Sequence, residues 1–401
     1  MKILCIFGTR PEAIKMAPII LELRRHSPDN VQTIVCVTGQ HREMLDQVMS
    51  LFRIQAHYDL NVMADNQTPT QVAGAVLTQL EPILHLERPD WVVVQGDTTT
   101  VAAGALAAFY ARVKVGHVEA GLRTGDKWQP FPEEINRRVA SVIADRHFAP
   151  TEQARQNLLD EGVLGDQILV TGNPVIDALH RVAGMPTAIE ATEILQRCGI
   201  GSNGFGNRIE PNGRAQIDQP SLILVTAHRR ENFGSPLNNI CLALRDIATT
   251  FQERVHIIYP VHLNPNVWDP VHKLLSDVPN ITLTPPLDYL NLVHIMKNAR
   301  LILTDSGGIQ EEAPGLGKPV LVLREVTERP EAVDAGTVLL VGSNRNRIAS
   351  EASRLLEDSD AYDRMAKAVN PYGDGQAAQR IVSSLMNEPV VPFQAGSGLY
   401  P

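Results

Sequence analysis

The sequence contains few cysteines, and they lie far apart. The four residues Cys5, Cys36, Cys198 and Cys241 show no CxxC spacing. Neither a disulfide framework nor a cysteine metal site is therefore expected. Cys5 and Cys36 lie inside apolar runs typical of strands, which predicts buried free thiols in a reducing cytoplasm.

Basic residues are outnumbered, and long apolar runs are missing. Lysine and arginine number 36 against 45 aspartates and glutamates, a net charge of -9, which argues against a nucleic-acid partner. No apolar run is long enough to span a bilayer, and no basic-then-apolar leader opens the chain. We therefore expect a cytoplasmic protein that does not enter the membrane.

Several common catalytic motifs are also absent. The sequence has no HExxH, no P-loop and no nucleophile elbow. Its G-x-G-x-x-G match at 199–204 follows a helical stretch and runs into a polar loop, whereas a dinucleotide site joins a strand to a helix. We therefore expect neither a nicotinamide cofactor nor a bound metal.

What the sequence does contain is a repeated alternation of apolar runs and helical segments. Such βαβ repeats predict parallel sheets with helices on both faces. The length of 401 residues favours two domains. The predicted fold class is therefore α/β, with two Rossmann-like doubly wound domains facing a cleft. The expected strands are 3–7, 31–37, 91–94, 114–118, 146–149, 167–170, 222–226, 255–259, 280–283, 301–304, 320–323 and 338–341.

One stretch in the second half has the character of an anion site. After the apolar run 301–303, Ser306, Gly307 and Gly308 permit a sharp turn into a helix start with free backbone N–H groups. We expect these residues to hold a diphosphate. Glu312 suits ribose hydroxyls, because a carboxylate accepts their hydrogen bonds. The alternative is an ordinary helix start whose acidic residues favour the dipole.

Three carboxylates in the first half follow strands or open a helix. Asp97 ends the third expected strand, Glu119 follows the fourth, and Glu133 lies in a Pro-Glu-Glu helix start. Carboxylates at one edge of a sheet could act as general acids and bases. The alternatives are a helix cap for Asp97 and a dipole-favouring acid for Glu133.

Cationic side chains also follow strands. Arg10 and Lys15 come after the first strand, and His228 comes after the first strand of the second half. Each could bind phosphate, and Arg329 adds a further cation near the Ser306 turn. The alternatives are surface charges near a helix start and, around His228, a surface salt-bridge cluster.

Motifs along residues 1–387 resemble those of the non-hydrolysing UDP-N-acetylglucosamine 2-epimerases. They are GTRPEAIKMAP (8–18), GQHREMLDQV (39–48), GDTTT (96–100), GHVEAGLRTGD (116–126), PEEINR (132–137), TGNPVIDAL (171–179), HRREN (228–232), YPVHLNPNV (259–267) and the long run 303–333.

The resemblance implies a fold of the glycosyltransferase-B type. It implies an N-terminal domain of 1–178, a UDP-binding domain of 179–374 and a helix of 375–387 that crosses back. The tail of 388–401 contains Pro, Gly and Ser and is expected to be loose. The implied reaction interconverts UDP-GlcNAc and UDP-ManNAc without NAD. UDP is eliminated to leave 2-acetamidoglucal and is then added back. The family also suggests a homodimer and a role in polysaccharide biosynthesis.

The resemblance assigns roles to residues by position. The implied catalytic residues are Asp97, Glu119, Glu133 and His228. The implied substrate-binding residues are Arg10, Lys15, Leu287, Leu292, Ser306, Gly307, Gly308, Glu312 and Arg329. Leu292 departs from relatives that carry Phe there. A regulatory site in some relatives would involve Gln40, His41 and His262.

Four alternatives stay open at this point. The chain could be a UDP-sugar-dependent glycosyltransferase, a non-catalytic UDP-sugar sensor, a hydrolysing epimerase that releases ManNAc, or an epimerase of a related UDP-diacetamido sugar. The sequence does not identify which carboxylate removes the C2 proton.

Overall fold

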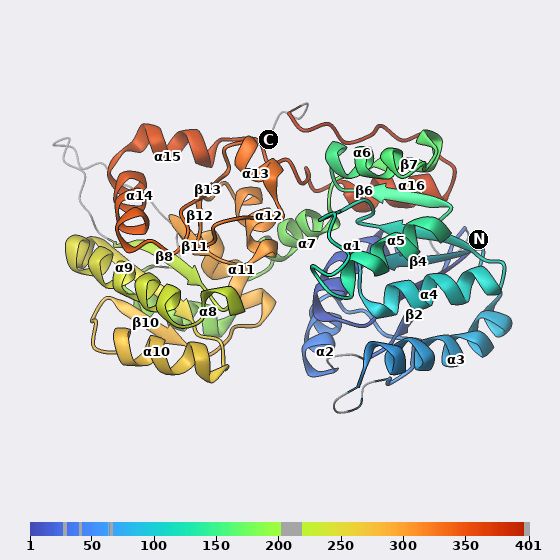
Figure 1. The fold of residues 1–401 in the computed structure, drawn as a ribbon, viewed down its shortest axis with the longest axis horizontal. Helices are drawn as coiled ribbons and strands as arrows, with labels where there is room; N and C mark the ends of the chain where they lie inside the picture. Colours follow the sequence, from blue (N-terminus) through green and yellow to red (C-terminus); the bar gives the residue numbers. More distant parts are fainter. Residues whose placement is uncertain (27–29, 40–41, 63, 65–66, 202–218, 397–401) are drawn as a thin grey trace. The chain divides into compact units, whose positions relative to one another are not determined.

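The structure is a computed structural model that describes residues 1–26, 30–39, 42–62, 64, 67–201 and 219–396 (Figure 1). The chain forms two compact units. Unit 1 comprises Met1–Ala178 and Tyr372–Pro401, and unit 2 comprises Leu179–Pro371. Within the described ranges, no helix is long and apolar enough to cross a membrane.

Unit 1 is built on a seven-stranded parallel sheet in the order β3-β2-β1-β4-β5-β6-β7. Its strands are β1 (Lys2–Phe7), β2 (Gln32–Val37), β3 (Tyr58–Asp59), β4 (Trp91–Gln95), β5 (Lys114–Val118), β6 (Arg146–Ala149) and β7 (Ile168–Val170). Its helices are α1 (Arg10–Arg25), α2 (Arg42–Leu51), α3 (Pro69–Glu87), α4 (Thr99–Tyr110), α5 (Glu133–Ile143), α6 (Glu152–Asp160), α7 (Pro174–Ala183), which runs into unit 2, and α16 (Ala377–Leu385).

Helices cover both faces of this sheet, as the apolar strands require. Residues 3–7 of β1 are completely buried, which is typical of a strand with no face toward solvent. On one face, α3, α4 and α5 pack against β1 and β4 in a single apolar core. α1 packs against α2 and α16.

Unit 2 repeats the plan with a six-stranded parallel sheet in the order β10-β9-β8-β11-β12-β13. Its strands are β8 (Ser221–Thr226), β9 (Val255–Pro260), β10 (Ile281–Thr284), β11 (Leu301–Thr304), β12 (Val320–Val322) and β13 (Val338–Leu340). Its helices are α8 (Ile189–Arg197), α9 (Ser235–Phe251), α10 (Pro265–Leu275), α11 (Tyr289–Asn298), α12 (Gly307–Gly315), α13 (Pro330–Asp334), α14 (Arg345–Glu357) and α15 (Ser359–Ala366). The main apolar core lies between this sheet and helices α9, α10, α14 and α15. The predicted α/β class with two doubly wound units is confirmed.

Local sequence explains where the first helices begin. Thr9 and Glu12 form a capping box, with Pro11 in the first turn of α1. The hydroxyl of Thr98 accepts the N–H of Val101 and caps α4. The N-cap of α4 is therefore Thr98.

The chain returns to unit 1 near its end. The carboxylate of Asp177 accepts the N–H groups of Ala377 and Ala378 at the start of α16, at 3.2 and 2.9 Å. The sequence predicts that the second domain ends at 374, whereas unit 2 ends at Pro371. Within the segment expected to be loose, Phe393 is buried, and its N–H donates to the Val170 carbonyl oxygen at 2.8 Å.

The four cysteines are buried free thiols, as the sequence predicts for Cys5 and Cys36. Burial raises the pKa of both Cys5 and Cys36 to about 12. They are therefore unreactive thiols at neutral pH.

Candidate active site

Most of the polar residues that the sequence singles out follow neighbouring strands at the points where strand order reverses. In unit 1 this switch point lies between β1 and β4, and in unit 2 it lies between β8 and β11. Ligands of doubly wound sheets bind outside the carboxyl ends of the strands at such points. At the switch points, β1 is followed by Gly8, β4 by Gly96 and β11 by Asp305, residues that do not favour continuing a buried apolar strand.

A cavity of about 450 Å³ lies at the switch point of unit 1. It is lined by Thr9, Arg10, Pro11, Glu12, Lys15, Met44, Gln95, Gly96, Asp97, Thr98 and Glu119. The structure therefore brings together four predicted site residues: Arg10, Lys15, Asp97 and Glu119. With Glu12 included, three carboxylates and two cations line one space large enough for a sugar.

Glu119 lies just beyond β5 and is 6% exposed. Both of its carboxylate oxygens contact Lys15 Nζ at 2.6 Å. Asn173 Nδ2 donates to Oε1 at 2.9 Å, and Gln95 Nε2 donates to Oε2. These donors favour the charged carboxylate in a buried position.

The backbone of Glu119 has φ = 62°, in the left-handed region. This conformation costs a residue other than glycine roughly 1 to 2 kcal/mol and is concentrated at functional sites. The turn is completed by Gly121, where an added Cβ would lie 2.1 Å from the Ala154 carbonyl oxygen. The chain thus holds Glu119 in a costly but fixed orientation.

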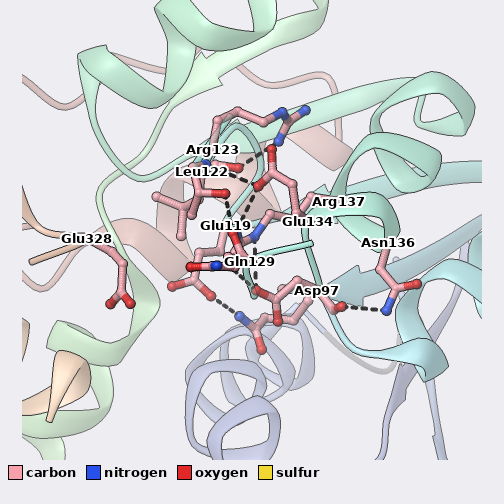
Figure 2. A network of polar contacts seen from close by, with 12 residues as sticks. Asp97, Glu119, Leu122, Arg123, Gln129, Glu134, Asn136, Arg137 and Glu328 are labelled. Carbon is pink, nitrogen blue, oxygen red and sulfur yellow. Dashed lines mark hydrogen bonds and ion pairs between the residues drawn. The ribbon is translucent and has the colours of Figure 1, made fainter. Parts of the chain in front are cut away.

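Asp97 lies beyond β4 and is paired with α5. Arg137 donates to Asp97 Oδ2 from Nε at 3.0 Å and from Nη2 at 2.6 Å, and Asn136 Nδ2 donates to the Asp97 carbonyl oxygen at 2.9 Å (Figure 2). The interpretation of Asp97 as a helix cap is wrong, because Thr98 performs that role. The fork of Arg137 instead fixes one carboxylate oxygen.

The two adjacent glutamates at the start of α5 have different environments. Glu134 is completely buried and accepts N–H groups from Thr124 at 3.1 Å and Gly125 at 3.4 Å, as well as Arg137 Nη1 at 3.1 Å (Figure 2). Glu133 is half-buried, and its Oε2 is buried without a hydrogen-bond partner among the described residues. Glu134 thus holds the preceding loop, whereas Glu133 leaves one buried oxygen without a hydrogen bond from the described residues. Glu133 is not among the side chains that line the cavity.

Arg10 is half-buried at the first turn of α1 and lines the cavity. Lys15 lies one turn further along and binds Glu119. Between them, Glu12 accepts N–H groups from Gly8 at 2.9 Å and Thr9 at 2.7 Å, together with the Thr98 hydroxyl at 2.7 Å. Burial raises the pKa of Glu12, although these hydrogen bonds oppose the shift. Glu12 therefore fixes the turn that carries Arg10.

In unit 2, the predicted anion site forms the start of α12. Ser306 is the N-cap residue, and its side chain makes no cap hydrogen bond within the described part of the chain. Gly307 and Gly308 form the first helical positions, with an added Cβ at Gly307 lying 3.7 Å from Arg229 Nη2. A helix N-terminus beside an arginine has the chemistry of a phosphate site.

The other predicted nucleotide-binding residues lie on or after α11 and α12. Glu312 is buried and accepts the Tyr289 hydroxyl at 2.7 Å, while Arg329 Nε donates to the neighbouring Glu311. Leu287 is buried just before α11, and Leu292 is half-buried on it. On α12, Glu312 is therefore hydrogen-bonded to α11, and Glu311 is hydrogen-bonded to the start of α13.

His228 follows β8 and stacks on His262, with ring centroids 5.5 Å apart and ring planes 12° apart. Burial lowers the pKa of His228, and the neighbouring Asp305 opposes that shift. His228 is the predicted catalytic histidine and His262 a predicted regulatory residue. The other two, Gln40 and His41, lie outside the described residues.

Several residues that organise the site have no role assigned from sequence. They are Glu12, Gln95, Arg137, Asn173 and Asp305. Four of them occur inside the recognised motifs, but the motifs do not reveal these contacts. Within the described ranges, no group of three or more His, Cys, Asp or Glu side chains could hold a metal ion.

Comparisons of the sequence with a family model and with known proteins identify the same family. The family model described as UDP-N-acetylglucosamine 2-epimerase matches residues 22–386. The UDP-N-acetylglucosamine 2-epimerase of Escherichia coli (strain K12) is 53% identical over 387 residues, covering 96% of this chain and 99% of that protein. The protein of the same name from Yersinia pestis is 53% identical over 392 residues, covering 97% of this chain and 100% of that protein.

A solved structure gives the same match in three dimensions. The crystal structure of UDP-GlcNAc 2-epimerase from Neisseria meningitidis bound to UDP-GlcNAc has a TM-score of 0.82 and 48% identity to this chain. The match covers 97% of this chain and 100% of that one.

Proposed function

Since the chain belongs to the UDP-N-acetylglucosamine 2-epimerase family, we propose that it interconverts UDP-GlcNAc and UDP-ManNAc. The observation that carries the proposal is the unit 1 cavity, where Asp97 and Glu119 face Arg10 and Lys15. The relative of known structure from Neisseria meningitidis was solved with UDP-GlcNAc bound, which supports a nucleotide sugar as the ligand.

The proposed chemistry follows from the weak acidity of the C2 proton, which has no adjacent carbonyl group. The C1–O bond breaks first, and its electron pair leaves with UDP. C1 becomes oxocarbenium-like, so a carboxylate can take the C2 proton and leave 2-acetamidoglucal. An acid then protonates C2 from the other face, and a UDP oxygen attacks C1. One proton leaves C2 and one is added to it, and the electron pair that left with UDP returns in the new C1–O bond, so the sequence of steps is redox-neutral.

The proton transfers are assigned to unit 1. Two opposed acid–base groups are needed, and Asp97, Glu119 and Glu133 are the candidates. The assignment of Glu119 is supported by the buried donors Lys15 and Asn173, which hold its carboxylate. The assignment of Asp97 is supported by the Arg137 guanidinium, which holds one of its oxygens. Glu133 is supported by a buried oxygen without a partner among the described residues. Groups held rigidly in this way need little reorganisation during the reaction.

The nucleotide is assigned to unit 2. Ser306, Gly307 and Gly308 would hold the diphosphate with His228, which would help to offset the charge of the leaving UDP. Glu312 and Arg329 would hold the ribose end, and Leu287 and Leu292 the uracil. The chemistry of the helix start beside Arg229 supports this assignment.

The test is proton NMR of UDP-GlcNAc with the purified protein in D₂O, without added NAD or metal. UDP-ManNAc with deuterium at C2 is the expected product. Transfer of the sugar to an acceptor would identify a glycosyltransferase, and free ManNAc with UDP a hydrolysing enzyme. A protein that binds UDP-GlcNAc but does not turn it over would then be tried with a UDP-diacetamido sugar.

We also propose a homodimer that works in the cytoplasm and supplies polysaccharide biosynthesis. The dimer is supported by an apolar stripe on α5, where Ile135, Val139 and Val142 are 42%, 36% and 88% exposed at helical spacing. α5 packs beside α4, whose last residues Phe109 and Tyr110 are also exposed. A second copy of this chain would cover these side chains.

The dimer prediction is tested by light scattering after size exclusion. The wild type is expected at the mass of two chains, and the double variant Val139→Glu/Val142→Glu at the mass of one, because glutamates would be buried unpaired at the interface. Ile189→Glu, on an exposed site of α8, is the control and should stay dimeric. A monomeric wild type would contradict the proposal.

A further inference from the structure

Asp305, just beyond β11, has two carboxylate oxygens in unequal environments. The residue is completely buried. Its Oδ2 accepts the N–H groups of His228 and Arg229 at 2.8 Å each and Asn232 Nδ2 at 2.9 Å. Its Oδ1 is also buried but has no hydrogen-bond partner among the described residues. A buried carboxylate oxygen without a donor is costly and calls for an explanation.

A titratable donor lies close to this oxygen. His228 Nδ1 is 3.7 Å from Asp305 Oδ1, slightly too far for a hydrogen bond. The His228 ring is stacked on His262 in this arrangement. His262 Nδ1 accepts the N–H of Asn264 at 3.1 Å, so the ring proton of neutral His262 lies on Nε2. A small rotation of the His228 ring would bring its Nδ1 to Asp305.

The surrounding backbone holds Asp305 and His228 together. Asp305 N–H donates to the Thr226 carbonyl oxygen at 3.0 Å, and the Tyr259 hydroxyl donates to the Ala227 carbonyl oxygen at 2.7 Å. Asn232 also binds the Leu323 carbonyl oxygen at 3.1 Å. The ends of β8, β9 and β11 thus fix the backbone of His228 and leave mainly its ring free to turn.

We propose that Asp305 is a positioning residue whose Oδ1 accepts the Nδ1–H of His228, directs Nε2 outward and lets Nε2 take up a proton when a diphosphate binds. The inference rests on the proposed function, because the ligand is the diphosphate of a uridine nucleotide. The proton comes from solvent, and no bond other than N–H is made or broken. The imidazolium then lies between two anions, Asp305 and the diphosphate.

The charges around the ring agree with this role. Burial lowers the pKa of free His228, Asp305 raises it, and His262 and Arg229 lower it. Together these influences lower the pKa of His228 below its ordinary value, which favours the neutral ring in the free protein. A diphosphate adds negative charge next to the ring and shifts its pKa upward. Binding of UDP should then be coupled to uptake of a proton.

The first test is calorimetry of UDP binding at pH 7.5 in two buffers of different ionisation enthalpy. The wild type is expected to take up close to one proton per UDP bound. His228→Gln should take up none, and Asp305→Asn should take up less than half, because an amide NH₂ facing the ring cannot accept Nδ1–H. Glu357→Ala, on an exposed residue of α14 in the same unit, is the control and should keep the wild-type uptake.

The second test reads the tautomer of His228 by ¹⁵N NMR in the protein without ligand. The His228 signal is identified among the 12 histidines as the one that His228→Gln removes. A proton on Nδ1 in the wild type, shifting toward Nε2 in Asp305→Asn, is expected. UDP binding without proton uptake, or an unchanged tautomer in Asp305→Asn, would overturn the inference. Failure of the wild type to bind UDP would count against the proposed function, and the tautomer would still decide the role of Asp305.

Discussion

Glu119 is buried, charged and held in a left-handed backbone conformation. Strain of this kind persists only where the surrounding structure enforces it. Here Lys15, Gln95 and Asn173 enforce it. The strained backbone lowers the free energy of unfolding, whereas a carboxylate fixed in position would raise the rate of the proposed reaction.

The first prediction concerns the charge of Glu119. Glu119→Gln keeps the size of the side chain but removes the base, so turnover should fall by about 10² to 10⁴-fold. The affinity for UDP, measured by calorimetry, should stay within about twofold, because the nucleotide is assigned to unit 2. The exposed Glu193→Gln serves as a control and should leave both unchanged. Equal losses of turnover and UDP affinity would show that Glu119 is structural.

At this scale the sequence predicts which segments follow the strands, but it does not predict which side chains pair there. Lys15 is expected to reach a phosphate, yet in the structure it binds Glu119, 104 positions along the chain. The pairing depends on β4 lying beside β1 and β5 beside β4. Strand order is not encoded in local periodicity, so contacts between strand ends cannot be derived from it.

At the scale of elements, the start of α5 gives a matched pair of predictions. Glu134→Gln removes a charge that binds two backbone N–H groups and Arg137. It should lower Tm by several degrees, since buried charge-assisted hydrogen bonds contribute roughly 1.5 to 3 kcal/mol each. Glu133→Gln should change Tm little but lower turnover by about 10²-fold or more. Calorimetric scans measure the Tm and the NMR assay measures the turnover of each variant. If Glu133→Gln lowered the Tm and Glu134→Gln lowered only turnover, the two roles would be exchanged.

The contact between Asp177 of α7 and the start of α16 predicts that folding stability depends on pH. Burial raises the pKa of Asp177 to about 7, despite hydrogen bonds from Ala378 and Ala377. In the unfolded chain the carboxyl has an ordinary pKa near 4. The folded protein therefore binds the extra proton between about pH 4 and pH 7, and its stability falls as pH rises through that window.

Asp177→Asn replaces the titrating group by a neutral one that can still accept an N–H. Compared with the wild type, the variant should have a higher Tm at pH 8 and a similar Tm at pH 5. Thermal scans across pH 4 to 8 measure the difference, with Asp160→Asn on the exposed end of α6 as control. A constant difference at every pH would mean that Asp177 does not titrate in this range.

Strand positions were largely predictable, because strands buried on both faces appear as continuous apolar runs. The runs 114–118, 146–149 and 301–304 coincide with β5, β6 and β11. β3, with only two residues, is too short to give a periodic signal. The expected strand 167–170 starts one residue late in the structure, because Gly165–Gln167 forms a 3₁₀ turn.

At the scale of the whole molecule, the separate cores of the two units predict separable responses to ligand. Apart from Arg10 and Lys15, which could bind phosphate, the residues assigned to the nucleotide lie in unit 2. UDP at about 100 times its Kd should stabilise the unit that binds it by about 2.7 kcal/mol. In a calorimetric scan, the transition that includes unit 2 should move to higher temperature.

Glu312→Ala should weaken this shift, because the proposed ribose contact is lost. Glu357→Ala, on an exposed residue of α14 in the same unit, should keep it. A shift of the same size in the Glu312 variant would remove Glu312 from the nucleotide site.

The α/β fold class of the whole molecule was predictable from the βαβ alternation. The glycosyltransferase-B type of fold was predictable only from the resemblance that the long motifs carry.

Unit 1 is discontinuous, and this has a consequence for how the protein is made. Its first 178 residues leave the ribosome well before α16, because residues 179–371 come between. At 5 to 20 residues per second, that interval lasts roughly 10 to 40 s. During this time the surface of α1 that α16 later covers stays open on the nascent chain. The growing polypeptide therefore exposes this surface of α1 until α16 has been translated.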